Sequence, residues 1–588
     1  MSDAPLTPDL VHGVPPVSVS STTTLVNKTG SWKYIRPIYR DRVAPCNEGC
    51  PVGIDIEGYM NLLREGRREE AVELLLRENP MPAVTGRVCY HPCENACNRR
   101  QYDEAVGIRA VERMLGDMAL TAPPAQVTGA RTGAIAIIGS GPAGLGCAYH
   151  LARMGYGVTI FEAAPEAGGI LRLGIPDYRL PAEILAGEID RIRTMGVEIR
   201  CGVRVGSDLP WSELDEFDAV FLATGAHNSR SLGLAGENSP GIQPGLEFLR
   251  RVSLGQRPEV GRRVLVLGGG NTAMDCARTA LRLGAAVEVL YRRTRAEMPA
   301  IDEEIEDAER EGVNLQFLVA PKAVRAEDGR LAGLECRRMR LGAPDASGRR
   351  RPVPVEGSDF FVAGDMVLTA IGEEIDAKSL PEQVTAADGV VPVSPLGEAA
   401  TRFFAGGDLV AQPRTVAHAL GAGKRAAVGI DRALRRAAGE EMQDHQDIDP
   451  LRYGAMGNVS MTRWHDDDPV VRNGAINEVV RFEKLNMDHF PRRARQRARS
   501  LTPEQCRTDF SEVLAGLPLA EAMAEARRCF NCGVCNRCEL CLIFCPDLAI
   551  SLRADGGGFN IDYDYCKGCG VCNAECPRGA MDMTREGL

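Results

Sequence analysis

The chain has 588 residues, which is too long for one ordinary domain and suggests roughly four units at about 150 residues each. Hydrophobic residues make up 44% and charged residues 25%, so there is enough apolar material for several cores. The net charge of −11 argues against a nucleic-acid-binding protein, which would normally carry a basic excess.

Neither export nor membrane insertion is predicted. The first residues, MSDAPLTPDL, lack a basic stretch followed by an apolar core. No apolar run reaches the ~18 residues that a membrane helix needs. We therefore expect a cytoplasmic chain without a membrane span. In that compartment the 20 cysteines stay reduced, and clustered cysteines indicate metal rather than disulfides.

The chain changes in texture along its length. Residues 1–40 show no periodicity and predict an extended arm. Residues 59–80 carry apolar side chains at helical spacing, with cysteines before and after them. From residue 133 onwards, short β-branched runs followed by glycines predict βαβ units and parallel sheets. Residues 432–475 are polar and predict a linker or surface excursion, and 511–528 predict a helix.

The first βαβ unit carries a dinucleotide fingerprint. Gly139, Gly141 and Gly144 form G-x-G-x-x-G directly after the strand AIAIIG. These glycines permit the tight turn, the close approach of a pyrophosphate and the packing of helix on strand. The phosphates would sit at the helix N-terminus. Glu162 ends the next strand, where a carboxylate can accept hydrogen bonds from ribose hydroxyls.

The second βαβ unit carries the same fingerprint after the strand RVLVLGG, with alanine in place of the third glycine. Its second strand ends in arginines rather than in an acid, which favours a 2′-phosphate and hence NADP(H). The alternative is that the arginines are solvated surface charges and that NAD(H) binds. The residues expected to bind this dinucleotide are Gly268, Gly270, Asn271, Thr272, Ala273, Arg292 and Arg293.

Two dinucleotide sites in one chain indicate one flavin and one nicotinamide. The segments FLATGA, with Thr224 and Gly225, and FFAGGD, with Asp408, are typical of the flavin domain in two-dinucleotide flavoproteins. If the first fingerprint binds FAD, the second lies in a domain inserted into the FAD domain. Hydride transfer then belongs to the cofactors, and we expect no protein general acid or base.

The C-terminal cysteines form two ferredoxin runs. The spacing C-x2-C-x2-C-x3-C-P occurs twice, and in such ferredoxins the fourth cysteine of each run ligates the other cluster. The alternative, a zinc module on an inactive flavoprotein, fits eight cysteines in paired spacing poorly. One [4Fe-4S] set is therefore Cys535, Cys538, Cys541 and Cys576, and the other is Cys566, Cys569, Cys572 and Cys545.

Five further cysteines flank the N-terminal helical segment: Cys46, Cys50, Cys89, Cys93 and Cys97. That number is too large for one four-iron cluster and too small for two. Residues 41–435 resemble the small subunit of NADPH-dependent glutamate synthase and its relatives, including dihydropyrimidine dehydrogenase. The resemblance rests on TGRVCYHPCENAC, EAAPEAGGILRLGIPDYRLP (which contains Gly169, assigned to the FAD site), YRRTRAEMPA and AGGDLV.

The resemblance implies FAD, NADPH and two N-terminal [4Fe-4S] clusters. The leading C-x2-C of that family is missing upstream of Cys46, and ARRCFNCG resembles the missing piece relocated towards the C-terminus. Our hypothesis is that Cys529 and Cys532 join Cys46 and Cys97 in one cluster. The other would hold Cys50, Cys89 and Cys93, and the resemblance places its fourth ligand at Glu112. The alternatives are a solvated acid at Glu112 and an unliganded cysteine pair.

The sequence therefore predicts an electron carrier, an α/β protein in which two nested Rossmann-like domains are combined with a helical iron–sulfur domain and an α+β ferredoxin-like domain. The expected partner is a ferredoxin or a larger redox enzyme. Candidates are a 2-oxoacid:ferredoxin oxidoreductase, dissimilatory sulfite reductase and the large glutamate synthase subunit. The oligomeric state is left open, a homo-oligomer included.

The expected boundaries follow from these motifs. They are an arm, 1–40; the helical iron–sulfur domain, 41–130; the FAD domain, 131–235 and 365–435; the NAD(P) domain, 236–364; a linker or partner region, 436–525; and the ferredoxin-like domain, 526–588.

Overall fold

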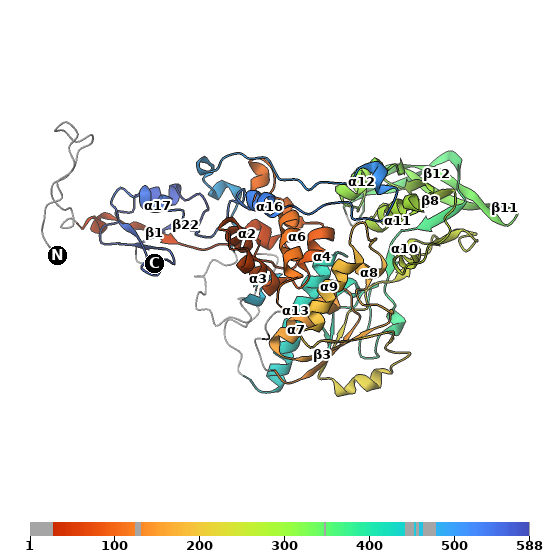
Figure 1. Ribbon diagram of the computed structural model, residues 1–588, viewed down its shortest axis with the longest axis horizontal. Helices are drawn as coiled ribbons and strands as arrows, with labels where there is room; N and C mark the ends of the chain where they lie inside the picture. The colour runs from red at the N-terminus through yellow and green to blue at the C-terminus, as the bar shows by residue number, and fades with distance from the viewer. Residues whose placement is uncertain are drawn as a thin grey trace. The chain divides into compact units, whose positions relative to one another are not determined.

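The computed structural model describes residues 28–123, 127, 131–345, 348–440, 452–453, 458–462 and 478–586. Residues 1–27 of the expected arm and most of the expected linker between 441 and 477 lie outside the described residues. The chain forms two compact units (Figure 1). We call Met1–Pro45, Pro469–Arg492 and Phe530–Leu588 the terminal unit, and Cys46–Asp468 with Arg493–Cys529 the central unit. Within the described ranges no helix is long and apolar enough to cross a bilayer.

The terminal unit joins the two ends of the chain in one sheet. Strand β1 (Ile35–Tyr39) pairs antiparallel with β22 (Met581–Arg585), so that Ile35 lies opposite Arg585 and Tyr39 opposite Met581. The expectation of an extended arm is therefore wrong for these residues. A five-residue edge strand whose partner lies more than 500 positions away gives no periodic signal of its own.

The rest of the terminal unit has the α+β character expected of a ferredoxin-like tail. Its elements are α17 (Leu540–Ile543), β20 (Ile550–Leu552), β21 (Phe559–Ile561) and α18 (Val571–Ala574). Strands β20 and β21 form an antiparallel pair in which Ile550 lies opposite Ile561.

The helical part of the central unit contains all five N-terminal cysteines. Where one helix was expected over 59–80, the chain forms α2 and α3, because Gly66 takes a positive φ of 83° between them. The helix expected over 511–528 is confined to α16, which begins directly after Pro518. The helices are α1 (Pro45–Glu48), α2 (Ile56–Arg64), α3 (Arg68–Glu78), α4 (Pro82–Val88), α5 (Pro92–Ala96), α6 (Ile108–Ala119) and α16 (Leu519–Ala526).

The first Rossmann-like sheet has the order β16-β17-β5-β2-β3-β4. All neighbours are parallel except the edge strand β16. Helices α7 (Pro142–Met154) and α13 (Val416–Ala437) lie side by side (Figure 1). The strands are β2 (Ala134–Ile138), β3 (Gly157–Glu162), β4 (Glu198–Cys201), β5 (Ala219–Leu222), β16 (Glu398–Ala400) and β17 (Phe403–Ala405).

The second, nested sheet is parallel and has the order β10-β9-β8-β14-β7. The helices of this nested domain are α10 (Gly245–Ser253), α11 (Asn271–Arg282) and α12 (Asp302–Glu311). A three-stranded antiparallel sheet follows β10 and consists of β11 (Val319–Glu327), β12 (Arg330–Pro344) and β13 (Arg350–Ala363). The parallel strands are β7 (Ile242–Pro244), β8 (Arg263–Leu267), β9 (Ala286–Tyr291), β10 (Asn314–Phe317) and β14 (Met366–Thr369).

The boundary expected at residue 364 is too early. Strand β14 pairs with β8, so the nested domain extends through Thr369. A short apolar strand fits either sheet by sequence, and only its pairing decides where it belongs. The two connections between the domains pair with each other as β6 (Asn228–Ser229) and β15 (Glu373–Glu374).

Arg42 fixes the N-terminal segment onto the tail. Its buried guanidinium pairs with Asp582 and Glu478 and donates to the carbonyl of Gly579 at 2.7 Å. The neighbouring Arg40 reaches Asp582 and Glu478 as well, but its side chain is half exposed. Burial should make the first arginine energetically important and the second nearly neutral.

We expect Arg42→Ala to lower the local opening free energy of β22 by about 1.5–3 kcal/mol, because several charge-assisted hydrogen bonds are lost. The matched control Arg40→Ala should change it by less than about 1 kcal/mol. Hydrogen exchange of the amides in residues 581–585 measures both, and equal effects of the two variants would contradict this assignment.

Candidate functional site

A cavity of about 460 Å³ lies at the carboxyl ends of the first parallel sheet. That size falls within the range of small-molecule and cofactor sites. Nine of the residues expected to bind cofactors line it: Gly139, Gly141, Glu162, Gly169, Thr224, Gly225, Asn271, Thr272 and Asp408. The structure therefore brings the FAD residues and the start of the second fingerprint together in one cavity.

The first glycine turn is shaped for a phosphate. A Cβ atom at Gly144 would lie 2.0 Å from the carbonyl oxygen of Gly139, so only glycine allows this helix to start so close to the strand. A Cβ atom at Gly141 would meet no atom within 4 Å. Gly141 therefore borders open space on the cavity side, where a pyrophosphate can approach the backbone.

Two carboxylates stand at the rim of the same cavity. Glu162 accepts hydrogen bonds from the backbone N–H groups of Ser140 at 2.8 Å and Ala164 at 2.7 Å, which fix its orientation at the end of β3. Asp408 lines the cavity, and burial raises its pKa while Arg414 opposes the rise. Both carboxylates line the cavity and could accept hydrogen bonds from hydroxyl groups of a bound FAD.

The residues expected to bind the nicotinamide dinucleotide reach the cavity at the start of α11. Asn271 and Thr272 open this helix within the cavity, and the Asn271 amide donates to the hydroxyl of Tyr90. Gly268, Gly270 and Ala273 form the turn and the first part of the helix, but they do not line the cavity.

The two arginines after β9 differ in availability. Arg293 is buried. Its guanidinium donates to the carboxylate of Asp345 at 2.6 Å and to the carbonyl of Arg350 at 2.8 Å. It is therefore held by the protein, which corrects the expectation that it reaches a 2′-phosphate. Arg292 is exposed and forms no ion pair among the described residues, so it keeps its guanidinium for a phosphate.

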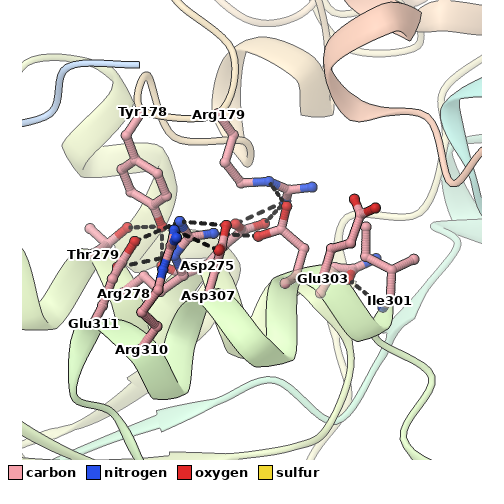
Figure 2. A network of polar contacts seen from close by, with 12 residues as sticks. Tyr178, Arg179, Asp275, Arg278, Thr279, Ile301, Glu303, Asp307, Arg310 and Glu311 are labelled. Carbon is pink, nitrogen blue, oxygen red and sulfur yellow. Dashed lines mark hydrogen bonds and ion pairs between the residues drawn. The ribbon is translucent and has the colours of Figure 1, made fainter. Parts of the chain in front are cut away.

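A polar network attaches the nested domain to the first one (Figure 2). Arg179 donates to both oxygens of Asp275 at 2.9 and 2.8 Å and pairs with Glu304 at 2.7 Å. Tyr178 donates to the carbonyl of Asp275 at 3.2 Å. Burial raises the pKa of Asp275 to about 6, and the positive charge of Arg179 opposes that rise.

Arg179 and Asp275 also line the cavity, together with Val88, Tyr90 and His227. The sequence analysis did not single out any of these five residues. The signal was present for two of them, because Tyr90 follows Cys89 directly and Arg179 lies in the quoted segment GIPDYRLP.

Cys50, Cys89, Cys93 and Glu112, the residues expected at the second N-terminal cluster, influence one another electrostatically and therefore lie near one another. Burial raises the pKa of Cys50 to about 11, and the charge of Glu112 adds to the rise. The pKa of Cys89 rises to about 12 through burial and then through Glu112 and Cys50. The pKa of Cys93 is raised by burial and then by Cys50 and Cys89.

Glu112 is oriented as a ligand would be. Its side chain is buried at 6% exposure, which excludes the alternative of a solvated helix acid. Oε1 accepts hydrogen bonds from Asn79 at 3.0 Å and from Thr85 at 2.5 Å. Burial raises the pKa of the carboxyl to about 7. Both of these hydrogen bonds fall on Oε1 rather than on Oε2.

Two arginines connect the segments that carry Cys97 and Cys529 within the central unit. Arg99, two residues after Cys97, donates to the carbonyl of Arg528, the residue before Cys529. Arg528 in turn pairs with Asp103 at 3.1 Å. The segments that carry Cys97 and Cys529 therefore lie side by side. Cys46 also belongs to the central unit, and Cys532 is buried in the terminal unit.

The tail cysteines fall into the two crossed sets. Burial raises the pKa of Cys535 to about 11 and that of Cys572 to about 12. In each case the charges that add to the rise come from the other three cysteines of the expected set: Cys538, Cys541 and Cys576 for the first, and Cys545, Cys566 and Cys569 for the second.

The donor sets fit iron–sulfur clusters. All twenty cysteines are free, and the eight of the two tail sets are thiols at ferredoxin spacing. Among the described side chains no three His, Cys, Asp or Glu residues lie close enough to chelate one metal ion. The fit to clusters therefore rests on the chemistry and the grouping of the donors.

The fold and the site define an iron–sulfur flavoprotein oxidoreductase. Residues 133–423 match the family described as pyridine nucleotide-disulphide oxidoreductase. Residues 40–123 match dihydropyrimidine dehydrogenase domain II, 4Fe-4S cluster, and residues 559–582 match the 4Fe-4S binding domain. The cofactors are thus FAD, NADP(H) and iron–sulfur clusters.

Three curated proteins are similar to this chain over most of its length. It is 41% identical to the NADP(+)-dependent formate dehydrogenase subunit beta of Moorella thermoacetica, over 83% of this chain and 70% of that one. It is 39% identical to the NADPH-Fe(3+) oxidoreductase subunit beta of Geobacter sulfurreducens, over 83% and 75%. It is 38% identical to the glutamate synthase [NADPH] small chain of Halomonas elongata, over 66% and 87%. The chain belongs to this family of iron–sulfur flavoprotein oxidoreductase subunits.

We expect Arg292→Ala to raise the KM for NADPH about tenfold, because one charge-assisted contact to the 2′-phosphate is lost, and to leave the KM for NADH unchanged. Steady-state dye reduction with both coenzymes measures this. The control Arg293→Ala should alter stability rather than coenzyme preference. Equal use of NADPH and NADH by the wild-type protein would contradict the assignment.

Proposed function

We propose that this chain is the NADPH-oxidising subunit of a larger redox enzyme and passes electrons singly through four [4Fe-4S] clusters to a partner. One observation carries the proposal. Val88 and Tyr90 line the cavity, whereas Cys89, between them, belongs to the set with Cys50 and Glu112. One segment of three residues therefore borders the cavity and also carries a cysteine of the cluster.

The chain's own residues bind and orient the cofactors. Gly139, Gly141, Glu162 and Asp408 would hold FAD, and the start of α11 with Arg292 would hold NADPH. When bound, the flavin supplies the conversion of a two-electron hydride transfer into one-electron steps. The network of Arg179 with Asp275 and Glu304 fixes α11 relative to the cavity, which is the positioning that hydride transfer requires.

Four clusters would use sixteen ligands. The hydrogen bond from Arg99 to the carbonyl of Arg528 supports Cys97 and Cys529 as members of the first set. From the sequence, we assign Cys46 and Cys532 as the other two ligands. Cys50, Cys89, Cys93 and Glu112 form the second set, and the tail cysteines form the third and fourth. We place the protein in the cytoplasm, because that compartment keeps so many cysteines reduced.

The partner we infer is a catalytic subunit of the same complex, since two of the relatives are named as beta subunits. The terminal unit offers a surface for it. Ile543 and Leu548 are 65% and 84% exposed and flank Cys545, and Phe544 and Leu552 are exposed as well. Exposed apolar side chains gathered in this way are typical of interaction sites.

Co-purification followed by mass spectrometry identifies the partner. Recovery of a thiamine-diphosphate enzyme, a sirohaem enzyme or a large amidotransferase would each select one of the candidates named from the sequence. Recovery of the chain alone, from cells that contain the complex, would contradict the assignment as a subunit.

Replacing both Cys529 and Cys532 by serine should remove about four iron atoms per chain, because one cluster loses two of its four ligands. NADPH oxidation by a two-electron dye should persist, because the cavity is untouched. Iron analysis after anaerobic reconstitution measures the loss, and the double variant Cys147→Ser with Cys276→Ser, outside the cysteine sets, serves as the control. An unchanged iron content would contradict the four-cluster count.

Leu548→Glu should slow electron transfer to the isolated partner at least tenfold, because a charge placed in an apolar contact stays desolvated on binding. The control Phe361→Glu places the same charge at another exposed apolar side chain, on β13. Dye reduction should be normal in both variants. If both variants slow transfer to the partner equally, the surface has been assigned wrongly.

A further inference from the structure

Tyr59 has a hydroxyl group that the described part of the chain leaves without a partner. The residue lies on α2 and has 0% exposed surface. Its Oη has no hydrogen-bond partner among the described residues. A buried hydroxyl without a hydrogen bond costs about 1–3 kcal/mol, so such a group indicates a water, an ion or a ligand beside it.

The start of α2 is bound to the loop between two cysteines. Asn47, which lies between Cys46 and Cys50, accepts hydrogen bonds from the backbone N–H groups of Ile56 at 3.0 Å and Glu57 at 3.1 Å. The Cys46 thiol donates to the same Asn47 oxygen at 3.6 Å. Tyr59 follows in the same helix, so the cysteine loop holds the start of the helix that carries this residue.

The charges around Tyr59 come from the proposed cluster ligands. Burial is the largest cause that raises the pKa of the phenol well above its usual value. The charges of Glu112, Cys93, Cys46 and Cys50, in decreasing order, raise it further. The first two belong to the set that lies beside the cavity. The hydroxyl of a tyrosine is a hydrogen-bond donor, and the sulfur atoms of these cysteines are acceptors.

We propose that Tyr59 donates a hydrogen bond to a sulfur of the cluster held by Cys50, Cys89, Cys93 and Glu112, and thereby raises the reduction potential of that cluster. The inference rests on the proposed function, since it needs the cluster to be present. Reduction adds one electron to the cluster while the phenol proton stays on Oη. A donor at a sulfur stabilises the more negative, reduced state.

The consequence is a better acceptor for the first electron that leaves the cavity. Tyr59 is thus a positioning residue, which acts through the cluster and touches neither coenzyme. The competing account is that Oη binds a buried water and that the ring only fills the core.

The test is Tyr59→Phe in the full-length, anaerobically reconstituted protein, with potentials from redox titration monitored by electron paramagnetic resonance. Loss of one hydrogen bond should make reduction of this cluster about tenfold less favourable, a fall of about 59 mV for a one-electron couple. The other clusters should keep their potentials. The control is Tyr149→Phe, because Tyr149 is equally buried but donates to the carbonyl of Leu76 at 2.7 Å.

Two results separate the inference from the proposed function. Full iron in Tyr59→Phe with unchanged potentials would overturn the inference alone. Wild-type protein without a cluster at these cysteines would overturn the proposed function and the inference with it. A structure of the reconstituted wild-type protein gives a second test that needs no variant. It should place Oη within hydrogen-bonding distance of a cluster sulfur, and Oη bound to a water instead would overturn the inference.

Discussion

The close packing of α4 on α6 is the contact on which the rest of the site depends. A Cβ atom at Gly86 would lie 2.4 Å from the Cα of Arg113, and one at Gly116 would lie 2.3 Å from the backbone nitrogen of Ala83. Only glycine at both positions allows the two helices to approach so closely. This approach brings Glu112 on α6 into hydrogen-bonding contact with Thr85 on α4, one turn before Cys89.

The same helix ends at the flavin cavity. The backbone N–H of Cys89 donates to the carbonyl of Thr85, which closes the last turn of α4. The chain then continues through Tyr90, whose hydroxyl accepts from Asn271 at the start of α11. One helix thus connects the cysteine set with both dinucleotide sites, and a shift of α4 would disturb all three. Cys89 and Tyr90 lie in the short connection between α4 and α5, so these two helices hold both residues in place.

Much of this architecture could be predicted from the sequence, because its signals are local. Gly139, Gly141 and Glu162 lie within one βαβ unit, and the tail cysteines lie within short runs of fixed spacing. The relocation of Cys529 towards Cys97 was a hypothesis from the family resemblance, and the contact of Arg99 with Arg528 supports it. The pairing of β1 with β22 was not predicted, because neither strand has a periodic signal that points to the other.

The errors concern contacts between distant parts of the chain. The partner of β1 is remote in sequence, and the same is true of Asp345, which holds Arg293 in an ion pair. Strand β14 could be assigned to its sheet only from its pairing with β8. Tyr90 and Arg179 were passed over because their importance comes from the cavity they share, and a cavity has no spacing that a sequence displays.

The central claim is that electrons leave the cavity through the Cys89 segment to the cluster that Glu112 completes. Rapid-freeze electron paramagnetic resonance after anaerobic mixing with NADPH tests it most directly, with Glu112→Gln to identify the cluster by its altered spectrum. The account predicts that the altered signal is the first cluster signal to appear. A tail cluster reduced first, or a Glu112→Gln spectrum identical to that of the wild-type protein, would contradict it.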